Sequence, residues 1–183
     1  MYTEKSMIGL FILFFVLMII SAVKMTYDYK KKGRLTLPGS VILLVWFCVH
    51  GLIMDYATCN SIYEQADNFL LRTTGILLIV SGLVIMVIAM INFGTFTRTM
   101  GVNTNELITT GLYRYTRNPQ YVGYGITVIG FNVAWFTPIS VVSMITYLIM
   151  IYITIVIEEK NLKRIYGEDF TSFCNTTPRF IGL

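Results

Sequence analysis

Two adjacent carboxylates, Glu158 and Glu159, stand directly after an apolar segment that ends at Ile157. Neighbouring positions on a helix point about 100° apart, so the two carboxylates cannot share one partner. In one interpretation Glu159 pairs with Lys163 one turn later, while Glu158 faces solvent. In the other, the pair forms part of a binding site, because burying a charge at the end of an apolar helix is costly without a partner.

A second polar stretch, residues 109–123, precedes the last two apolar segments. Within it, Asn118 followed by Pro119 predicts the start of a helix, with Asn118 as the N-cap. The free N–H groups at that start suit a carboxylate or phosphate, and Arg114 and Arg117 lie beside it. The alternative is that both arginines only anchor the chain at a membrane interface.

The apolar segments 120–136 and 138–157 are separated by a single residue, which predicts a tight helical hairpin. The ends of the two segments that lie away from the hairpin turn, near residues 120 and 157, are then side by side. They form one cluster of arginines, carboxylates and tyrosines. A ligand that carries both a carboxylate and a cation would match this cluster. S-adenosylmethionine is such a ligand, with an amino acid group, a sulfonium and a ribose diol. The tyrosines that could face the sulfonium are Tyr113, Tyr115, Tyr121 and Tyr124.

The composition places these residues in a membrane protein. The chain of 183 residues is 55% hydrophobic and 13% charged, and its mean hydropathy is +0.67. Soluble domains carry about 25% charged residues. Five apolar segments are each close to the length that crosses a bilayer. We therefore predict an all-α, polytopic integral membrane protein. The segments are residues 7–23, 41–54 (with 35–40 as an extension), 73–91, 120–136 and 138–157.

The ends of these segments predict further details of the fold. We expect the last helix to continue to Tyr166 and to end at Gly167. The first segment lacks a basic flank and a cleavage site, so we expect a retained span and not a signal peptide. The chain is expected to form one membrane-embedded domain. In it, residues 1–106 shape the substrate side and residues 107–183 form the cofactor-binding half.

The basic residues predict the orientation. Twelve lie on one side of the predicted spans, whereas Lys5 and Arg72 lie on the other. By the positive-inside rule the N-terminus is outside and the C-terminus cytoplasmic, so the polar cluster faces the cytoplasm. The membrane is the cell membrane or the endoplasmic reticulum. The twelve are Lys24, Lys30, Lys31, Lys32, Arg34, Arg98, Arg114, Arg117, Lys160, Lys163, Arg164 and Arg179.

Several function classes are excluded. The basic residues lie between apolar segments and form no single soluble face, which argues against nucleic acid as a partner. The three cysteines are far apart and His50 is the one histidine, so we predict no metal site. The sequence shows no internal repeat, which argues against a transporter built from inverted repeats. We expect His50 to have a helix-packing or interfacial role, with a functional role as the alternative. The oligomeric state stays open.

Residues 107–181 resemble the C-terminal half of the isoprenylcysteine carboxyl methyltransferases and phospholipid N-methyltransferases. The signature of that superfamily, Arg-His-Pro-x-Tyr-x-Gly followed by a hairpin and a Glu-Glu pair, is matched by residues 117–123 and by Glu158 and Glu159. The upstream Gly-x-Tyr matches Gly111 and Tyr113, and the downstream Thr-Pro-Arg matches residues 177–179.

The resemblance implies an S-adenosylmethionine site at the cytoplasmic face and a lipophilic substrate that enters from the bilayer. Arg117, Glu158 and Glu159 would be catalytic, and Arg179 and Tyr124 would contact the substrate. The cofactor would be held by Tyr113, Arg117, Asn118, Pro119, Tyr121, Gly123, Glu158 and Glu159.

Asn118 stands where the superfamily has histidine, so this position offers no general base. This favours carboxylates or other ionised groups as methyl acceptors over amines, and the acceptor itself is open between a prenylcysteine-like carboxylate and a phospholipid amine. Two alternatives are an NADPH-dependent sterol-type reductase with a related hairpin and a non-enzymatic lipid-binding protein. A cavity lined by Arg117, Glu158 and Glu159 would argue against the second.

Overall fold

The computed structural model describes residues 4–61, 68–94 and 106–181. Its described residues form five long helices and one 3₁₀ helix, without a strand. They are α1 (Glu4–Lys32), α2 (Leu37–Ser61), α3 (Phe69–Asn92), η1 (Gly111–Arg114), α5 (Pro119–Ala134) and α6 (Pro138–Thr176). The predicted all-α fold is confirmed. Of the basic residues counted above, Arg98 and the side chain of Lys5 lie outside the described residues.

Four of these helices, α1, α2, α3 and α6, are long and apolar enough to cross a membrane. The predicted segment 120–136 corresponds to α5, which has only 16 residues because it ends at Ala134. A helix of that length falls short of the ~20 residues that a bilayer requires. The chain is therefore a polytopic membrane protein in which one of the five long helices, α5, is shorter than predicted.

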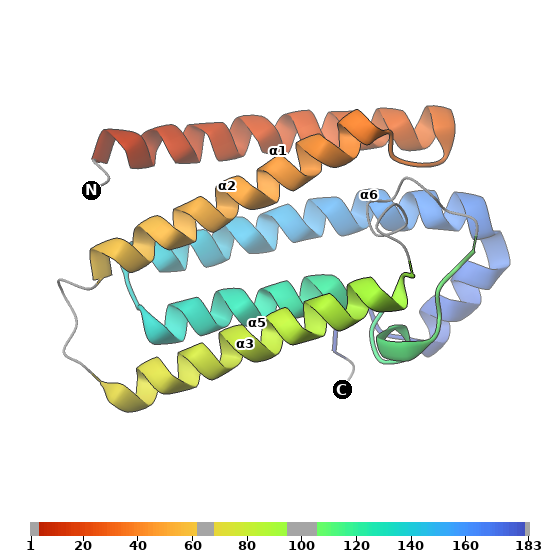
Figure 1. Ribbon diagram of the computed structural model, residues 1–183. Coiled ribbons are helices and arrows are strands. Elements are labelled where there is room, and N and C mark those ends of the chain that lie inside the picture. The colour runs from red at the N-terminus through yellow and green to blue at the C-terminus, as the bar shows by residue number, and fades with distance from the viewer. Residues whose placement is uncertain (1–3, 62–67, 95–105, 182–183) are drawn as a thin grey trace.

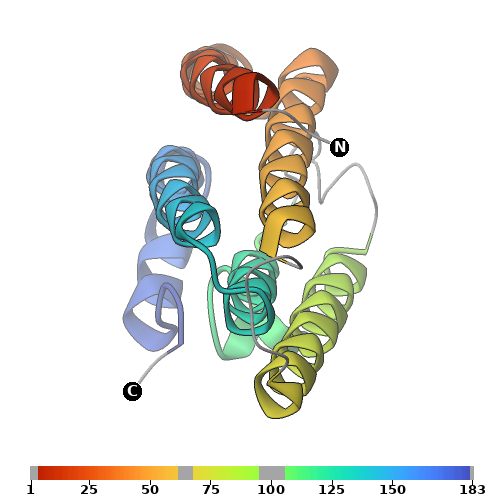
Figure 2. The same ribbon diagram turned by 90° about the vertical axis from the view of Figure 1, so that its left-hand side faces the viewer.

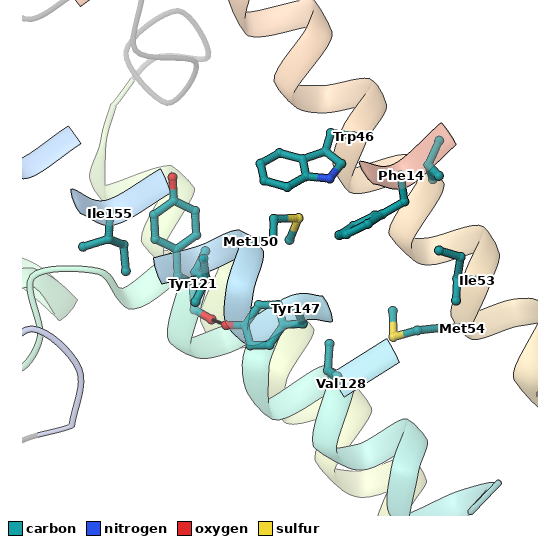
Figure 3. Close-up of a cluster of buried hydrophobic side chains, with 11 residues drawn as sticks. Phe14, Trp46, Ile53, Met54, Tyr121, Val128, Tyr147, Met150 and Ile155 are labelled. Carbon is teal, nitrogen blue, oxygen red and sulfur yellow. Dashed lines mark hydrogen bonds between the residues drawn. The ribbon is translucent and has the colours of Figure 1, made fainter. Parts of the chain in front are cut away.

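The helices form two pairs with α6 between them (Figures 1 and 2). α1 packs on α2, α3 packs on α5, and α6 contacts α1, α2 and α5. The core where the pairs meet is made of aromatic and aliphatic side chains, several of which Figure 3 shows. Trp46 and Met150 are fully buried at its centre, and Tyr147 donates a 2.6 Å hydrogen bond to the carbonyl oxygen of Tyr121.

Glycines bring the backbones of α3 and α5 into direct contact. A Cβ atom added to Gly82 would lie 2.5 Å from the carbonyl oxygen of Gly123, and one added to Gly130 would lie 2.7 Å from that of Gly75. In a membrane, where lipid is as apolar as leucine, helix association depends on such close packing. These contacts hold the short α5 against a helix that does span the bilayer.

The hairpin between α5 and α6 is confirmed and has a well-defined turn. Thr137 caps α6: its hydroxyl accepts from the backbone of Ser140, and the Ser140 hydroxyl accepts from the backbone of Thr137, both at 3.0 Å. The predicted end of α6 at Gly167 is confirmed only in part. Gly167 has a φ of +54°, but the chain then resumes a helical course to Thr176. The result is a kink after the two glutamates.

His50 has the helix-packing role that was one of its two expected roles. Its side chain is fully buried between α2, α5 and α6. The Nδ1 atom lies 2.7 Å from the hydroxyl of Tyr124, and Nε2 lies 2.9 Å from the carbonyl oxygen of Ser143. Since a carbonyl oxygen only accepts, Nε2 donates there and Nδ1 accepts from the tyrosine. A polar group buried among apolar helices is satisfied in this way.

The turn between α1 and α2, the end of α3, the start of α5 and the second half of α6 all lie at one end of the bundle (Figure 1). The twelve basic residues predicted to be cytoplasmic, apart from Arg98, lie in these segments or close to them in the chain. Arg72, near the start of α3, lies at the opposite end. This grouping is the one from which the orientation was predicted, and the side of the membrane stays a prediction.

The contact between α3 and α5 makes Gly82 intolerant of a side chain. Changing Gly82→Ala places a methyl group against the backbone of α5, and overpacking of this kind costs about 1–3 kcal/mol. We expect a lower midpoint of thermal unfolding for the purified protein in detergent.

Gly51→Ala is the matched control, because a Cβ there has nothing within 4 Å. Alanine is the better helix former by about 1 kcal/mol, so this change should leave the midpoint unchanged or raise it. Equal midpoints for both variants would contradict the proposed close contact.

Candidate functional site

A pocket opens where η1, the start of α5 and the second half of α6 meet. Its volume is about 130 Å³. Phe93, Leu107 and Phe170 are among its apolar lining residues. Three more lining residues come from α1, the α1–α2 turn and α2: Tyr29, Leu35 and Leu43. Other polar side chains that line it are Glu106, Tyr113, Arg117, Asn118, Gln120, Tyr121, Glu158, Glu159 and Asn161. Two halves of the chain therefore contribute to one pocket.

Glu159 forms the centre of an ion cluster at the pocket wall. Arg179 binds its carboxylate with two hydrogen bonds, of 3.0 Å from Nε and 2.5 Å from Nη2. Nη1 of Arg117 lies 3.2 Å from the same carboxylate. Donating these hydrogen bonds to Glu159 raises the pKa of Arg179, so this guanidinium keeps its charge. The predicted alternative, pairing of Glu159 with Lys163, is wrong.

The C-terminal segment is fixed to the residues before α5. The backbone N–H of Arg117 donates to the carbonyl oxygen of Pro178 at 2.9 Å. The carbonyl oxygen of Arg179 accepts from the hydroxyl of Thr116 at 3.1 Å and from the amide of Asn118 at 2.9 Å. These bonds close the chain around the pocket, so Arg117 and Arg179 reach Glu159 from opposite segments.

Asn118 precedes α5 as predicted, and Pro119 occupies the first turn. The side chain of Asn118, however, makes no capping hydrogen bond, so the predicted N-cap interaction is wrong. The amide is used instead to hold the backbone of Arg179. Tertiary pairing with the C-terminal segment has replaced the local cap.

Glu158 faces the pocket and has a different partner from Glu159. The hydroxyl of Tyr121 lies 2.9 and 3.0 Å from its two carboxylate oxygens. Within the part of the chain that the structure describes, this hydroxyl is the one donor to Glu158. A carboxylate has about four acceptor positions, so most of its capacity remains for a ligand. The alternative in which Glu158 faces only solvent is wrong.

Tyr121 is held in place by its neighbours in the bundle. Its ring stacks on Phe47 with an interplanar angle of 2°, and its carbonyl oxygen accepts from Tyr147. Phe47 and Tyr147 both contact the ring of Tyr124, the partner of His50. The membrane core thereby fixes the tyrosine that holds Glu158.

Tyr113 lies on the far side of the pocket, packed with Phe170 and Phe173. Its hydroxyl donates a hydrogen bond to Gln120. Burial, together with the nearby charge of Glu158, raises the pKa of Tyr113 well above its usual range. This phenol stays protonated and serves as a hydrogen-bond donor, not as a base.

The structure brings together most of the predicted site residues. Tyr113, Arg117, Asn118, Tyr121, Glu158 and Glu159 line the pocket. Four others do not line it: Pro119 is buried at the helix start, Gly123 contacts α3, Tyr124 binds His50, and Arg179 holds Glu159 from outside.

Several pocket residues escaped the sequence analysis. Asn161 follows Glu158 by three positions, a spacing that places both on one face of a helix and could have indicated it. Gln120 adjoins the motif and could have been included. The N-terminal part of the chain contributes Tyr29 of α1, Leu35 of the α1–α2 turn and Leu43 of α2. No local sequence pattern there indicates contact with the pocket. Within the described residues, no group of three His, Cys, Asp or Glu side chains could hold a metal.

Comparison with known families agrees with this geometry. The model of the phospholipid methyltransferase family matches residues 70–169. The chain belongs to the phospholipid methyltransferase family. The match includes α3, η1, α5 and most of α6, and with them all of the polar lining residues except Tyr29. It leaves out α1, α2 and Arg179.

A curated relative of this family member is the methanethiol S-methyltransferase of Crocosphaera subtropica. The two chains are 35% identical over 77 residues, which is 40% of this chain and 28% of that protein. The alignment thus spans little more than a quarter of the relative's length. No solved structure matches the chain.

The ion cluster predicts a structural role for Glu159. Glu159→Gln leaves two arginines without a charged partner, and breaking a buried pair costs about 3–5 kcal/mol. The half-exposed Arg179 recovers part of this from water, so we expect a loss of about 2 kcal/mol. Thermal unfolding in detergent measures it.

Glu168→Gln is the control, because this exposed carboxylate is on the same helix beyond the kink. It should unfold at the wild-type midpoint. A Glu159 variant as stable as the Glu168 variant would show that the ion cluster contributes nothing to stability.

Proposed function

We propose that this family member is an S-adenosylmethionine-dependent methyltransferase that acts on a lipophilic acceptor at a membrane. The observation that carries the proposal is the pocket itself. In a chain of the phospholipid methyltransferase family, Glu158 and Arg117 line one cavity and offer opposite charges to one ligand. This arrangement also argues against a purely structural role for Glu158.

The residues present fit the charges of this cofactor. Glu158 has free acceptor positions for a ribose hydroxyl or an ammonium group. The Nε atom of Arg117 is buried and has no hydrogen-bond partner among the described residues, so it can donate to a carboxylate. Pockets for small molecules usually measure about 300–1,000 Å³. The present volume is smaller, so binding of a whole nucleoside would have to widen the pocket.

When bound, S-adenosylmethionine supplies a methyl group on a sulfonium, which is a good leaving group. The protein then has two tasks: to align the acceptor with the methyl group and to exclude water. Alignment alone can lower a barrier by ~7–11 kcal/mol. Tyr121, which lines the pocket and is held by stacking on Phe47, gives the pocket a rigid wall for this purpose.

The proton of the acceptor limits the choice of substrate. Tyr113 stays protonated and Asn118 does not titrate, so among these residues only a carboxylate could act as a base. Glu159 is bound by two arginines, which leaves Glu158. An acceptor that is already ionised needs no base. A carboxylate or a thiolate meets this condition, and the thiolate is the second candidate because the curated relative is named a methanethiol S-methyltransferase.

Binding of the cofactor product tests the proposal directly. We expect S-adenosylhomocysteine to raise the thermal unfolding midpoint of the detergent-purified protein. A ligand at about 100 times its dissociation constant stabilises by ~2.7 kcal/mol. Glu158→Gln should lose most of the rise, because an amide cannot balance a cation, whereas Glu168→Gln should retain it.

NADPH is the comparison ligand. A rise with NADPH and none with S-adenosylhomocysteine would favour the sterol-type reductase instead. No rise with either ligand would remove the enzyme proposal and leave a lipid-binding protein.

The acceptor is tested by transfer of a labelled methyl group. With S-adenosylmethionine labelled at the methyl group, we expect incorporation into an acceptor that is soluble in organic solvent. Phosphatidylethanolamine, a prenylcysteine and a long-chain alkanethiol are compared in parallel. An ionised acceptor should be preferred over the amine by about tenfold near neutral pH, since no histidine lines the pocket. Preferential labelling of the amine would contradict this order and would indicate that Glu158 serves as the base.

A further inference from the structure

We propose that the end of the bundle beside the pocket is a docking surface for the headgroups of anionic phospholipids. The basic surface consists of side chains from the α1–α2 turn and from the second half of α6, all of them exposed. They are Lys30, Lys31, Lys32, Lys160, Lys163 and Arg164. The proposal does not depend on the methyltransferase activity.

The structure joins two segments that are far apart in sequence. Arg164 donates from Nη1 to the carbonyl oxygen of Lys30 at 3.1 Å and also binds that of Tyr29. Asn161 donates from its amide to the carbonyl oxygen of Gly33 at 2.9 Å. These bonds satisfy two carbonyl groups in the last turn of α1 and hold its three terminal lysines next to α6. The six cations thus form one surface.

The acidic side chains of these elements do not neutralise the basic surface. Asp28 is fully buried and is bound by Lys24 at 2.5 Å and by the backbone and hydroxyl of Thr36. Glu158 and Glu159 face the pocket, where Tyr121 and two arginines bind them. Glu168 and Asp169 are exposed but follow the kink at Gly167. The excess positive charge therefore remains available to an outside anion.

The position of the basic surface indicates a lipid as the source of that anion. It begins where the apolar segments of α1 and α6 end in the sequence, which is where the headgroups of a bilayer are expected. Large apolar side chains adjoin it: Leu37 is 70% exposed and Tyr27 56% exposed. A phospholipid offers a phosphate to the lysines and an acyl chain to these neighbours. A soluble anion would use only the charges.

The basic surface adjoins the pocket, because Arg164 donates hydrogen bonds to Tyr29 and Asn161, which both line the pocket. Anionic lipids gathered there lie next to the site. The lipid environment of the pocket is then enriched in negatively charged headgroups relative to the bilayer as a whole.

Native mass spectrometry of the full chain tests the proposal. Protein in detergent is mixed with phosphatidylglycerol and phosphatidylcholine of equal acyl chains, and the lipids retained are counted. We expect a preference for phosphatidylglycerol of about tenfold. The variant Lys31→Gln, Lys32→Gln, Lys160→Gln, Lys163→Gln should lose it. Arginine at the same four positions should keep it, since the charge is conserved.

Arg72→Gln, at the opposite end of the bundle, should also retain the preference. The wild-type preference should fall as salt rises from about 0.1 M to about 1 M, where the Debye length shrinks to about 3 Å. This measurement decides the matter even if the glutamine variant does not fold. Equal retention of the two lipids by the wild type would overturn the proposal. So would displacement of the lipid by an equal concentration of inorganic phosphate, which would indicate a site for a soluble anion.

Discussion

The carboxylate of Glu159 holds together the three segments that form the pocket. Arg117 reaches it from the start of α5, Arg179 reaches it from the C-terminal segment, and Glu159 itself is on α6. In surroundings with little water, a charge of this kind must be paired, and each partner lost leaves another charge uncompensated. The cluster thereby fixes the distance between the two ends of the hairpin. It also decides which glutamate is left for a ligand: Glu159 is bound on both sides, whereas Glu158 accepts from a single hydroxyl.

The ion cluster can form only because α5 is held at the right depth. At 16 residues this helix is too short to be positioned by the bilayer, and its packing against α3 places it instead. The contact is between backbones, so little adjustment is possible along it. Tyr121, one turn into α5, is further fixed by Phe47 of α2 and Tyr147 of α6. The position of the Glu158 carboxylate therefore depends on four helices, although its only described donor is one tyrosine.

The features that were predictable from the sequence are those set by local chemistry. Hydropathy predicted the long helices, the Asn118–Pro119 pair predicted the start of α5, and Gly167 predicted a break in α6. Of the ten site residues named from the sequence, six line one pocket and four do not. Partners across the fold could not be predicted: the amide of Asn118 binds a backbone carbonyl near the C-terminus, and Glu159 binds two arginines in place of Lys163. The predicted N-cap of α5 and the predicted pair on α6 are both replaced by tertiary contacts, which residue spacing does not encode. The walls contributed by α1 and α2 were unpredictable for the same reason.

Those walls bear on how the pocket is divided. Most of its polar groups come from the family-matched part of the chain, while Tyr29, Leu35 and Leu43 come from α1, the α1–α2 turn and α2, which lie outside that match. A charged cofactor and an apolar acceptor need different surroundings, since a charge requires paired polar groups and an acyl chain requires none. A pocket with one wall of each kind can hold both in contact only along the line where the walls meet. This supports the proposal that α1 and α2 shape the acceptor side.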